Sequence, residues 1–297
     1  MRIASNTTSD VMIRQIQQLT GEQTKLQLQV STGRRITQPE DDPTAVGRVL
    51  TLQSEKRQIG QYGSNAIRAL TLAQTSFSGL QGLKKISDRA GELATLGTGA
   101  MSTDAMKAYA TEVEQLLEQA LQLGNTRAGS DYIFAGTAVD APAFSATRVA
   151  GQITAVAFDG NTTQAVIPLS EATSVSPSTT GTTNQGIGDF LNHLVQLRDA
   201  LASGDIDAVR GVQSGLTDDE DLLISAMADN GGIQTRIEAA QVQQKDRATS
   251  IEKLIANETS VDLPTTIVRL NQTNTAYQAA LASASKIMNL SLLDYIR

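Results

Sequence analysis

Two segments at opposite ends of the chain carry apolar residues at alternating spacings of four and three. The first contains Met12, Ile16, Leu19, Gln23, Leu26 and Val30, and the second contains Leu263, Ile267, Leu270, Asn274, Tyr277, Leu281, Ala284 and Met288. An average spacing of about 3.5 residues keeps a narrow apolar seam on one side of a helix. Such a seam is buried only against a partner helix, either at the other end of the chain or in a neighbouring molecule. The pattern favours an assembly subunit over a compact enzyme. We assign the large apolar residues of both seams, with Leu292 and Leu293, to an assembly interface.

The composition excludes several classes of protein. The 297 residues include 31 acidic and 24 basic side chains, and the net charge of −7 argues against binding to nucleic acid. Cysteine is absent, so disulfides, zinc fingers and thiol nucleophiles are excluded. Aromatic residues make up only 3%, which is typical of thin helical bundles. No apolar run approaches the roughly 20 residues of a membrane span, and no apolar segment of a cleaved signal peptide follows Met1. We therefore expect neither membrane insertion nor a cleaved leader.

Helix signals cover both halves of the chain. Gly33 is placed to end the first helix, and Gly204 to end a later one. The run at residues 230–232, Asn-Gly-Gly, predicts another break. The expected helices span residues 5–32, 44–96, 103–128, 187–203, 206–229, 233–257 and 264 to near 297.

The middle of the chain has the composition of a small β-rich insertion. Residues 131–186 are rich in Gly, Thr, Ser and Pro, and small and apolar residues alternate around Val156 and Phe158. The run Asp159-Gly160-Asn161 predicts the turn of a β-hairpin, and residues 174–186 indicate a linker. The predicted fold is mainly α: an elongated antiparallel helical bundle built from both chain ends, with a small β-rich insertion in the middle.

Three regions follow from this layout. Gln23 and Asn274 lie within the two seams, where polar residues cost stability but fix register. The predicted regions are terminal coiled-coil helices at 1–40 and 263–297, a helical bundle at 41–130 and 187–262, and an outer insertion at 131–186.

The loop after the first helix has the features of a fixed joint. It contains Arg34, Arg35, Pro39, Asp41, Asp42 and Pro43. The prolines restrict the backbone, and the aspartates can accept hydrogen bonds from backbone N–H groups in turns. The arginines can reach carboxylates on an adjacent subunit. We expect these six residues to hold an angle between two layers of an assembly. Turn formation explains the acidic side chains better than cation binding does.

Candidate catalytic residues are scarce. His193 is the single histidine, and a place on a helix surface is favoured over a Ser-His-Asp triad. The acidic run 218–221 lacks the spacing of a calcium loop, so we interpret it as a solvated helix face. Glycine pairs at 97–99 and 186–188 do not complete a nucleotide-binding motif. The chain is predicted not to be an enzyme and to need no metal or cofactor.

Four motifs point to one family. They are STGRRITQPEDDPTA at residues 31–45, QYGSNA at 61–66, GSDYIFAGT at 129–137 and AALASASKIMNLSLLDYI at 279–296. These motifs resemble segments of the bacterial flagellin superfamily, and the last two are similar to its hook–filament junction branch. The first motif is the most specific. The similarity covers roughly residues 1–137 and 190–297.

The resemblance implies a secreted, extracellular structural subunit of the bacterial flagellum that leaves the cell through the type III export apparatus. In the family, paired terminal helices line an inner tube, and a closed ring of about eleven subunits joins the hook to the filament. The implied partners are further copies of the chain, the first hook-associated protein, flagellin and a cytoplasmic export chaperone that covers the C-terminal seam.

One family function is matched less well. Flagellin carries a segment that an innate immune receptor recognises. Here residues 87–93 keep Arg89, Glu92 and Leu93 of that pattern, but Gly91 stands in place of an arginine.

Three alternatives remain open. A divergent flagellin would form long filaments alone, whereas a junction protein should not. A soluble helical binding module would keep both terminal helices stable in the dilute monomer. An enzyme would need His193 for turnover.

Overall fold

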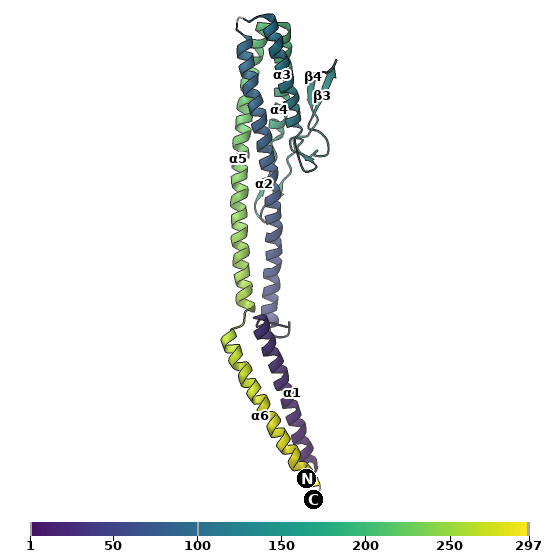
Figure 1. Cartoon of the computed structure of the whole chain (residues 1–297), viewed down its shortest axis with the longest axis vertical. Coiled ribbons are helices and arrows are strands. Elements are labelled where there is room, and N and C mark those ends of the chain that lie inside the picture. The colour runs from purple at the N-terminus through teal and green to yellow at the C-terminus, as the bar shows by residue number, and fades with distance from the viewer. Residues whose placement is uncertain (1, 100, 296–297) are drawn as a thin grey trace. The chain divides into compact units, whose positions relative to one another are not determined.

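The computed structural model describes the backbone of residues 2–99 and 101–295 and the side-chain exposure of residues 10–99 and 101–286. The helices of the described residues are α1 (Arg2–Thr32), α2 (Pro43–Gly97), α3 (Thr103–Gly124), α4 (Gly181–Ser203), α5 (Ile206–Thr259) and α6 (Leu263–Tyr295) (Figure 1). Three short antiparallel pairs lie between α3 and α4: β1 (Arg127–Ala128) with β2 (Asp131–Tyr132), β3 (Phe144–Val149) with β4 (Gln152–Phe158), and β5 (Ile167–Pro168) with β6 (Ser174–Val175). The predicted helical class with a small central β insertion is confirmed.

The chain divides into two compact units. The first contains Met1–Arg57 and Ala248–Arg297, and the second contains Gln58–Arg247. The long helices α2 and α5 therefore each contribute residues to both units. The three-region division predicted above stays a prediction.

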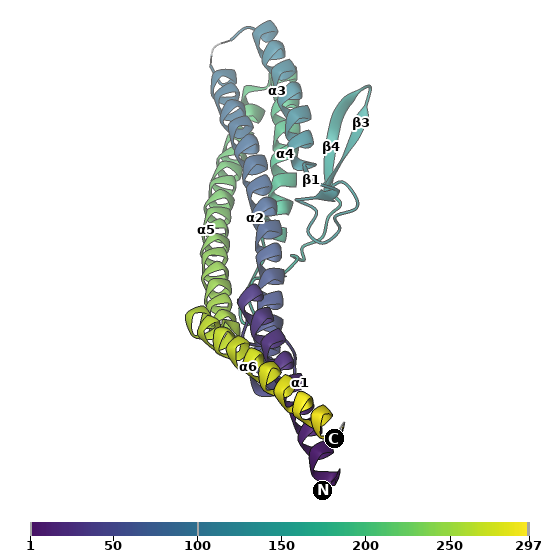
Figure 2. The same ribbon diagram turned by 60° about the horizontal axis from the view of Figure 1, so that its bottom comes forward.

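The first unit is built on an antiparallel pair of helices, α1 and α6, which lie side by side in Figures 1 and 2. Gln23 of α1 contacts Asn274 of α6, whereas Gly33 at the end of α1 contacts Val261 just before α6. Gly33 has φ +67°, a left-handed conformation that ends α1 as predicted.

The second unit holds the main core, which α2, α3, α4 and α5 share with the strands. Phe144 of β3 is the link between helices and strands, because its ring lies against Gly124 at the end of α3 and Gly188 of α4. Its ring centroid is 5.6 Å from that of Phe158 on β4. Figure 2 shows the β3–β4 hairpin on the side of α3 and α4.

A smaller core lies beneath the β5–β6 pair. Leu169 is fully buried there against a face of small residues, Ala66, Ala69 and Ala73 of α2, and near Ile237 of α5. Its carbonyl oxygen accepts a hydrogen bond from Gln244 Nε2 at 3.0 Å. The segment after β5 therefore fastens both long helices of the second unit.

The predicted break at residues 230–232 is wrong, because α5 continues through it. Leu223 is buried in the larger core before these residues, and Ile237 in the smaller core after them. Asn230 also accepts a hydrogen bond from Gln234 at 2.7 Å. Packing on both sides outweighs the roughly 1 kcal/mol that each helical glycine costs relative to alanine.

The predicted hairpin turn at residues 159–161 is also wrong. The turn lies at Ala150 (φ 53°) and Gly151 (φ 88°), between β3 and β4. Two consecutive positive φ angles match the twist of a tight hairpin, but alanine gives no sequence signal for that conformation. Gly160 is instead required by close packing, since an added Cβ would lie 2.9 Å from Ala135 Cα.

Three helix ends differ from the predictions. The first helix begins at Arg2 rather than at residue 5. The third ends at Gly124 because the amide of Asn125 exchanges two hydrogen bonds with the backbone of Phe144. The predicted linker at 174–186 contains β6 and the start of α4, where the Thr180 side chain caps the helix by accepting from Thr183 N at 3.1 Å.

Leu169→Ala is expected to destabilise the second unit. Removing a fully buried leucine side chain leaves a cavity under the β5–β6 pair, and the free energy of unfolding should fall by about 2–4 kcal/mol. Leu96→Ala is the matched control, because Leu96 is 47% exposed. Guanidinium unfolding followed by circular dichroism measures both. Equal shifts of the two midpoints would contradict the anchoring role of Leu169.

Candidate assembly surface and joint

The apolar seam of α1 faces inward along its described length. Exposed residues surround it, whereas its own members are partly or fully buried: Met12, Ile16, Leu19, Gln23, Leu26 and Val30. Leu26 is the most enclosed of these, at 8% exposure. Within one molecule, the predicted partner at the other end of the chain, α6, covers this seam.

The inward face of α6 differs from the predicted seam. The least exposed positions on its described part are Thr266, Leu270, Thr273, Asn274, Tyr277, Ala280 and Ala284. Three of the predicted residues, Leu263, Ile267 and Leu281, are instead 41%, 44% and 43% exposed. Threonine and alanine are small enough to let two helices approach closely. The Thr266 hydroxyl also donates to the carbonyl oxygen of Asp262 at 2.7 Å, so its burial leaves no unpaired donor. Met288, Leu292 and Leu293 belong to α6, but their side chains lie outside the described residues.

The two polar seam residues pair with each other. Gln23 Nε2 donates to Asn274 Oδ1 at 2.7 Å across the helix interface. A shift of either helix by one turn would leave both amides without this partner. This hydrogen bond supports the predicted role of Gln23 and Asn274 in fixing the register of the α1–α6 pair.

Apolar side chains remain on the outside of the helix pair. They are Val11, Ile13 and Leu28 on α1 and Leu263, Ile267, Val268 and Leu281 on α6, each between 41% and 55% exposed. Ile267 and Leu281 are fourteen positions apart, with Asn274 midway, so they lie along one side of α6. This second row flanks the row that α1 covers.

The loop after α1 is tied to the segment between α5 and α6 by backbone hydrogen bonds. Arg35 N donates to the carbonyl oxygen of Thr259 at 2.7 Å, and Val261 N donates to that of Gly33 at 3.0 Å. Arg34 and Ser260 form the antiparallel bridge between these bonds. The joint therefore consists of two strand-like segments that pair with each other, one after α1 and one between α5 and α6.

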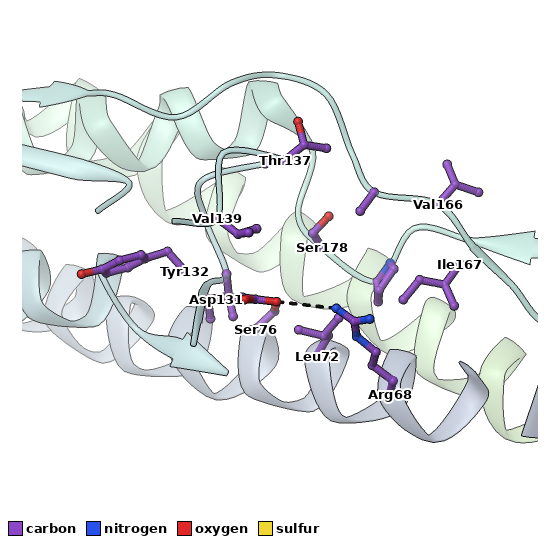
Figure 3. Close-up of a pocket in the computed structure, with 14 residues that line it drawn as sticks. Arg68, Leu72, Ser76, Asp131, Tyr132, Thr137, Val139, Val166, Ile167 and Ser178 are labelled. Atoms are coloured by element: carbon purple, nitrogen blue, oxygen red, sulfur yellow. Dashed lines mark ion pairs between the residues drawn. The ribbon is translucent and has the colours of Figure 1, made fainter. Parts of the chain in front are cut away.

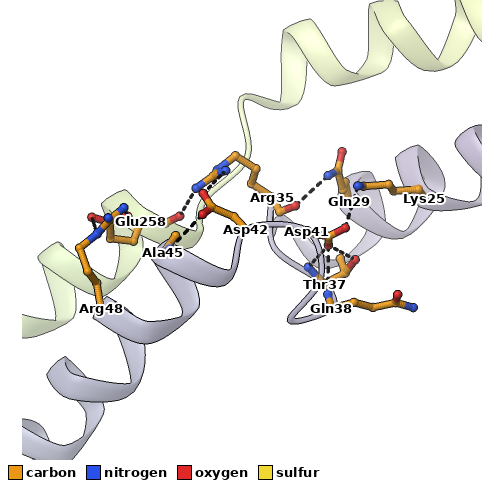
Figure 4. A network of polar contacts seen from close by, with 10 residues as sticks. All are labelled: Lys25, Gln29, Arg35, Thr37, Gln38, Asp41, Asp42, Ala45, Arg48 and Glu258. Atoms are coloured by element: carbon orange, nitrogen blue, oxygen red, sulfur yellow. Dashed lines mark hydrogen bonds and ion pairs between the residues drawn. The ribbon is translucent and has the colours of Figure 1, made fainter.

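Asp41 closes the loop on itself (Figure 4). Its Oδ2 atom accepts from Thr37 N at 2.9 Å, from the Thr37 hydroxyl at 2.9 Å and from Gln38 N at 3.0 Å. Its Oδ1 atom lies 2.7 Å from Lys25 Nζ of α1. The contact with Lys25 and the two backbone donors lower the pKa of Asp41 well below its usual 3.8.

Asp42 and Glu258 hold the arginines of the joint. Asp42 Oδ1 caps α2 by accepting from Ala45 N at 3.0 Å, and Arg35 lies 3.2 Å from its other oxygen. Arg35 also donates to the carbonyl oxygen of Glu258, whose carboxylate binds both Nε and Nη2 of Arg48 at 3.0 and 2.9 Å. The backbone donor and Arg35 lower the pKa of Asp42, and Arg48 lowers that of Glu258.

These contacts confirm turn formation as the role of the loop carboxylates. Arg35 finds its carboxylate within the chain rather than on a neighbour, whereas Arg34 has no side-chain ion pair among the described residues. Pro43 is the first residue of α2, where the missing N–H costs nothing, and Pro39 is exposed. A role of these six residues between layers of an assembly stays a prediction.

The other predicted candidates lie in the second unit. His193 Nδ1 lies 2.6 Å from Asp219 Oδ2, and Asp219 is only 6% exposed. The interpretation of residues 218–221 as a solvated helix face is therefore wrong for Asp219, because its carboxylate is buried against His193 of α4. Burial raises the pKa of Asp219.

The receptor-like segment is partly enclosed by its own chain. Arg89 pairs with Glu92 at 2.8 Å and with Glu112 of α3 at 2.6 Å. Leu93 is fully buried. Recognition of this segment by a receptor stays a prediction. Because Leu93 is buried, such recognition would have to use other residues of the segment.

Two kinds of site are not found in the described part of the chain. None of its helices is long and apolar enough to cross a membrane. No group of three or more His, Asp or Glu side chains there is placed to hold a metal ion.

Asp41→Ala is expected to loosen the joint. The backbone N–H groups of Thr37 and Gln38 lose their acceptor, a change of about 1–2 kcal/mol, so their hydrogen exchange should accelerate about tenfold. The lowered pKa means that the stabilisation is complete above 3.8 and is lost as the pH falls towards the pKa of the folded state. The difference in exchange between wild type and variant should therefore shrink below about pH 4. Glu40→Ala, at an exposed position of the same loop, is the control. Equal acceleration in both variants would argue against a specific role for Asp41.

Comparisons with known proteins agree with this architecture. Residues 3–138 match the model of the bacterial flagellin N-terminal helical region. The flagellar hook-associated protein 3 of Salmonella typhimurium is 30% identical over 148 residues, which are 48% of this chain and 46% of that protein. The protein of the same name from Escherichia coli is 24% identical over 288 residues, 90% of each chain. The chain thus matches about half the length of the first relative and most of the second.

Two solved structures share the fold. A protein assigned as a flagellar hook-associated protein of Vibrio parahaemolyticus has a TM-score of 0.66 at 18% identity, over 74% of this chain and all of that one. The flagellar junction protein FlgL from Legionella pneumophila has a TM-score of 0.53 at 13% identity, over 71% and 99%. The relatives are flagellar structural proteins and not enzymes, as predicted for this chain. The resemblance noted in the sequence is confirmed: the N-terminal part of the chain matches the flagellin N-terminal helical region, and the chain is similar to proteins named flagellar hook-associated protein 3.

Proposed function

We propose that the chain is a structural subunit of the bacterial flagellum at the junction between hook and filament. The observation that carries the proposal is the helix pair of the first unit. It buries one seam internally and leaves a second apolar row exposed on α6 at Leu263, Ile267 and Leu281. The names of the two curated relatives support a place among the hook-associated proteins.

The exposed row fits packing between copies of the chain. Burying a large aliphatic side chain gives about 1.5–3 kcal/mol, so several such residues on one helix provide a substantial driving force for association. The row on α6 and the apolar residues on α1 are different surfaces, so a contact between them would be head-to-tail. Head-to-tail contacts close into rings when the rotation allows it, and the resemblance to the flagellar family implies a ring of about eleven copies.

The remaining partners follow from the same role. A junction ring has one face toward the hook, which we assign to the first hook-associated protein, and one toward the filament, which we assign to flagellin. Export through the type III apparatus requires the exposed row to be shielded before assembly. We propose that a cytoplasmic chaperone covers it, and that the assembled subunit is extracellular.

Leu281→Asp tests the exposed row. A carboxylate that must be desolvated between subunits costs several kcal/mol, so filament attachment should be lost while the second unit keeps its fold. Motility, electron microscopy of flagella and circular dichroism of the purified chain measure the two effects. Ala282→Asp is the control, because it adds the same charge to an exposed neighbouring position of α6. Normal filaments in the Leu281 variant, or equal loss in both, would rule out a specific role for the row.

The double substitution Asp42→Ala with Pro43→Ala tests the joint. It removes the cap of α2 and the residue that forbids helix before Thr44, so the loop should extend α2 toward its N-terminus. Secreted protein with easily sheared filaments is the expected result. Pro39→Ala with Glu40→Ala provides a matched control, since both residues are exposed and lie in the same loop. Full motility of the first variant in viscous medium would make the loop a simple connector.

The assembly experiment also separates the alternatives. Purified chain that polymerises alone into long filaments would indicate a divergent flagellin. A monomer whose terminal helices stay folded on dilution, with no association, would indicate a helical binding module.

A further inference from the structure

A groove lies along one face of α5 in the second unit. Its volume is about 620 Å³. Ala228, Gly232 and Arg236 of α5 line one side of the groove, and parts of residues 164–180, around β5 and β6, line the other. Both sides belong to the same compact unit, so the groove is present in a single copy of the chain.

The groove contains a glycine that packing within the chain does not explain. An added Cβ would meet no atom within 4 Å at Gly231 or Gly232. By contrast, an added Cβ at Gly186 of α4 would lie 2.4 Å from the Leu222 side chain, so packing accounts for glycine there. Glycine is unfavourable in a helix interior relative to alanine, but it lets another backbone approach closely. Because Gly232 is exposed, this part of α5 is open to a second helix.

Two opposite charges flank Gly232. Asp229 precedes it by three residues and Arg236 follows it by four, so both charges lie on the same face of α5. Seven residues of helix place them about 10 Å apart along the axis. Both residues are exposed, and neither forms an ion pair with another described residue. This face of α5 therefore presents one unpaired anion and one unpaired cation, with a glycine between them.

The charges on this face are complementary to themselves. If a second copy lies antiparallel across Gly232, a twofold axis places Asp229 of each copy opposite Arg236 of the other, and both ion pairs form together. Two α5 helices that lay parallel in register would instead bring like charges together. A second helix would also cover Val166 on the far side of the groove, which is 63% exposed. We propose that two copies of the chain form an antiparallel dimer through this face of α5.

The dimer is separate from the ring described under the proposed function. A twofold contact uses the same surface on both copies, so it joins two copies and does not extend to a third. The apolar row assigned to ring contacts belongs to α6 in the first unit, whereas Gly232 lies in the second unit. The dimer is therefore a form of the subunit before assembly, and each contact can be removed without the other.

Sedimentation equilibrium of the full-length chain tests the proposal, with the wild type and the Leu281→Asp variant measured side by side. The second chain lacks the apolar contact on α6, so its association reports on α5. It should form a dimer with a dissociation constant on the order of 10 μM, as expected for a small interface. A Leu281→Asp chain that stays monomeric overturns the dimer, whatever the wild type does. A chain that dimerises normally and still builds normal filaments counts against the proposed function and leaves the dimer standing.

Charge reversal tests the antiparallel geometry in the same Leu281→Asp chain. Asp229→Arg and Arg236→Asp each place two pairs of like charges in the dimer, so each should raise the dissociation constant about tenfold or more. An equimolar mixture of these two variants should dimerise again, because both contacts in the mixed dimer join opposite charges. Dimers that tolerate either reversal, or a loss that mixing does not restore, contradict the antiparallel pairing.

Gly232→Leu tests the close approach of the two helices. The leucine side chain should abolish the dimer, while the thermal unfolding midpoint stays equal or rises because leucine favours helix more than glycine does. Gly211→Leu is the matched control, since Gly211 is another exposed glycine of α5 with open space around it, about 31 Å along the helix from Gly232. Unchanged dimerisation of the Gly232 variant, or equal loss in both variants, contradicts a contact centred on Gly232.

Discussion

The structure of the first unit depends on one constraint: two helices packed together can bury only one stripe each. On α1 that stripe takes the large apolar residues, and on α6 it combines Leu270 and Tyr277 with threonines, alanines and Asn274. Leu263, Ile267 and Leu281 on α6 therefore remain outside, where contact of their side chains with water is unfavourable. The two helices fold as a pair, yet apolar side chains on both of them stay exposed. This is the physical basis for treating it as part of an assembly.

The joint solves a different problem, which is to hold two helix ends without a core. Its residues are largely exposed, so individual ion pairs such as Arg48 with Glu258 contribute little. Backbone hydrogen bonds between Arg35 and Thr259 and between Gly33 and Val261 set the pairing of the two segments. The carboxylate of Asp41 then fixes the turn by accepting from two backbone N–H groups. Because these bonds are directional, they fix the pairing of the two segments where exposed apolar contacts could not.

The second unit is stabilised by burial. Phe144 connects α3 and α4 to the hairpin, and Leu169 connects the β5–β6 pair to α2 and α5. Each anchor lies against glycine or alanine, since close approach requires the absence of a larger side chain. Residues 165–178 also line a cavity beside α2 (Figure 3).

The sequence by itself determined the helical class, the seam of α1, the ends at Gly33 and Gly204, and the capping role of the loop carboxylates. These follow from local periodicity, backbone conformation and short-range hydrogen bonds. Only the tertiary structure decided the face of α6 that turns inward, because small and large residues alternate around that helix and the choice depends on its partner. It also decided the continuity of α5 through Gly231 and Gly232, the hairpin turn at Ala150 and Gly151, and the pairing of His193 with Asp219. The cavity beside α2 gave no sequence signal, since its residues come from three distant segments that only packing brings together.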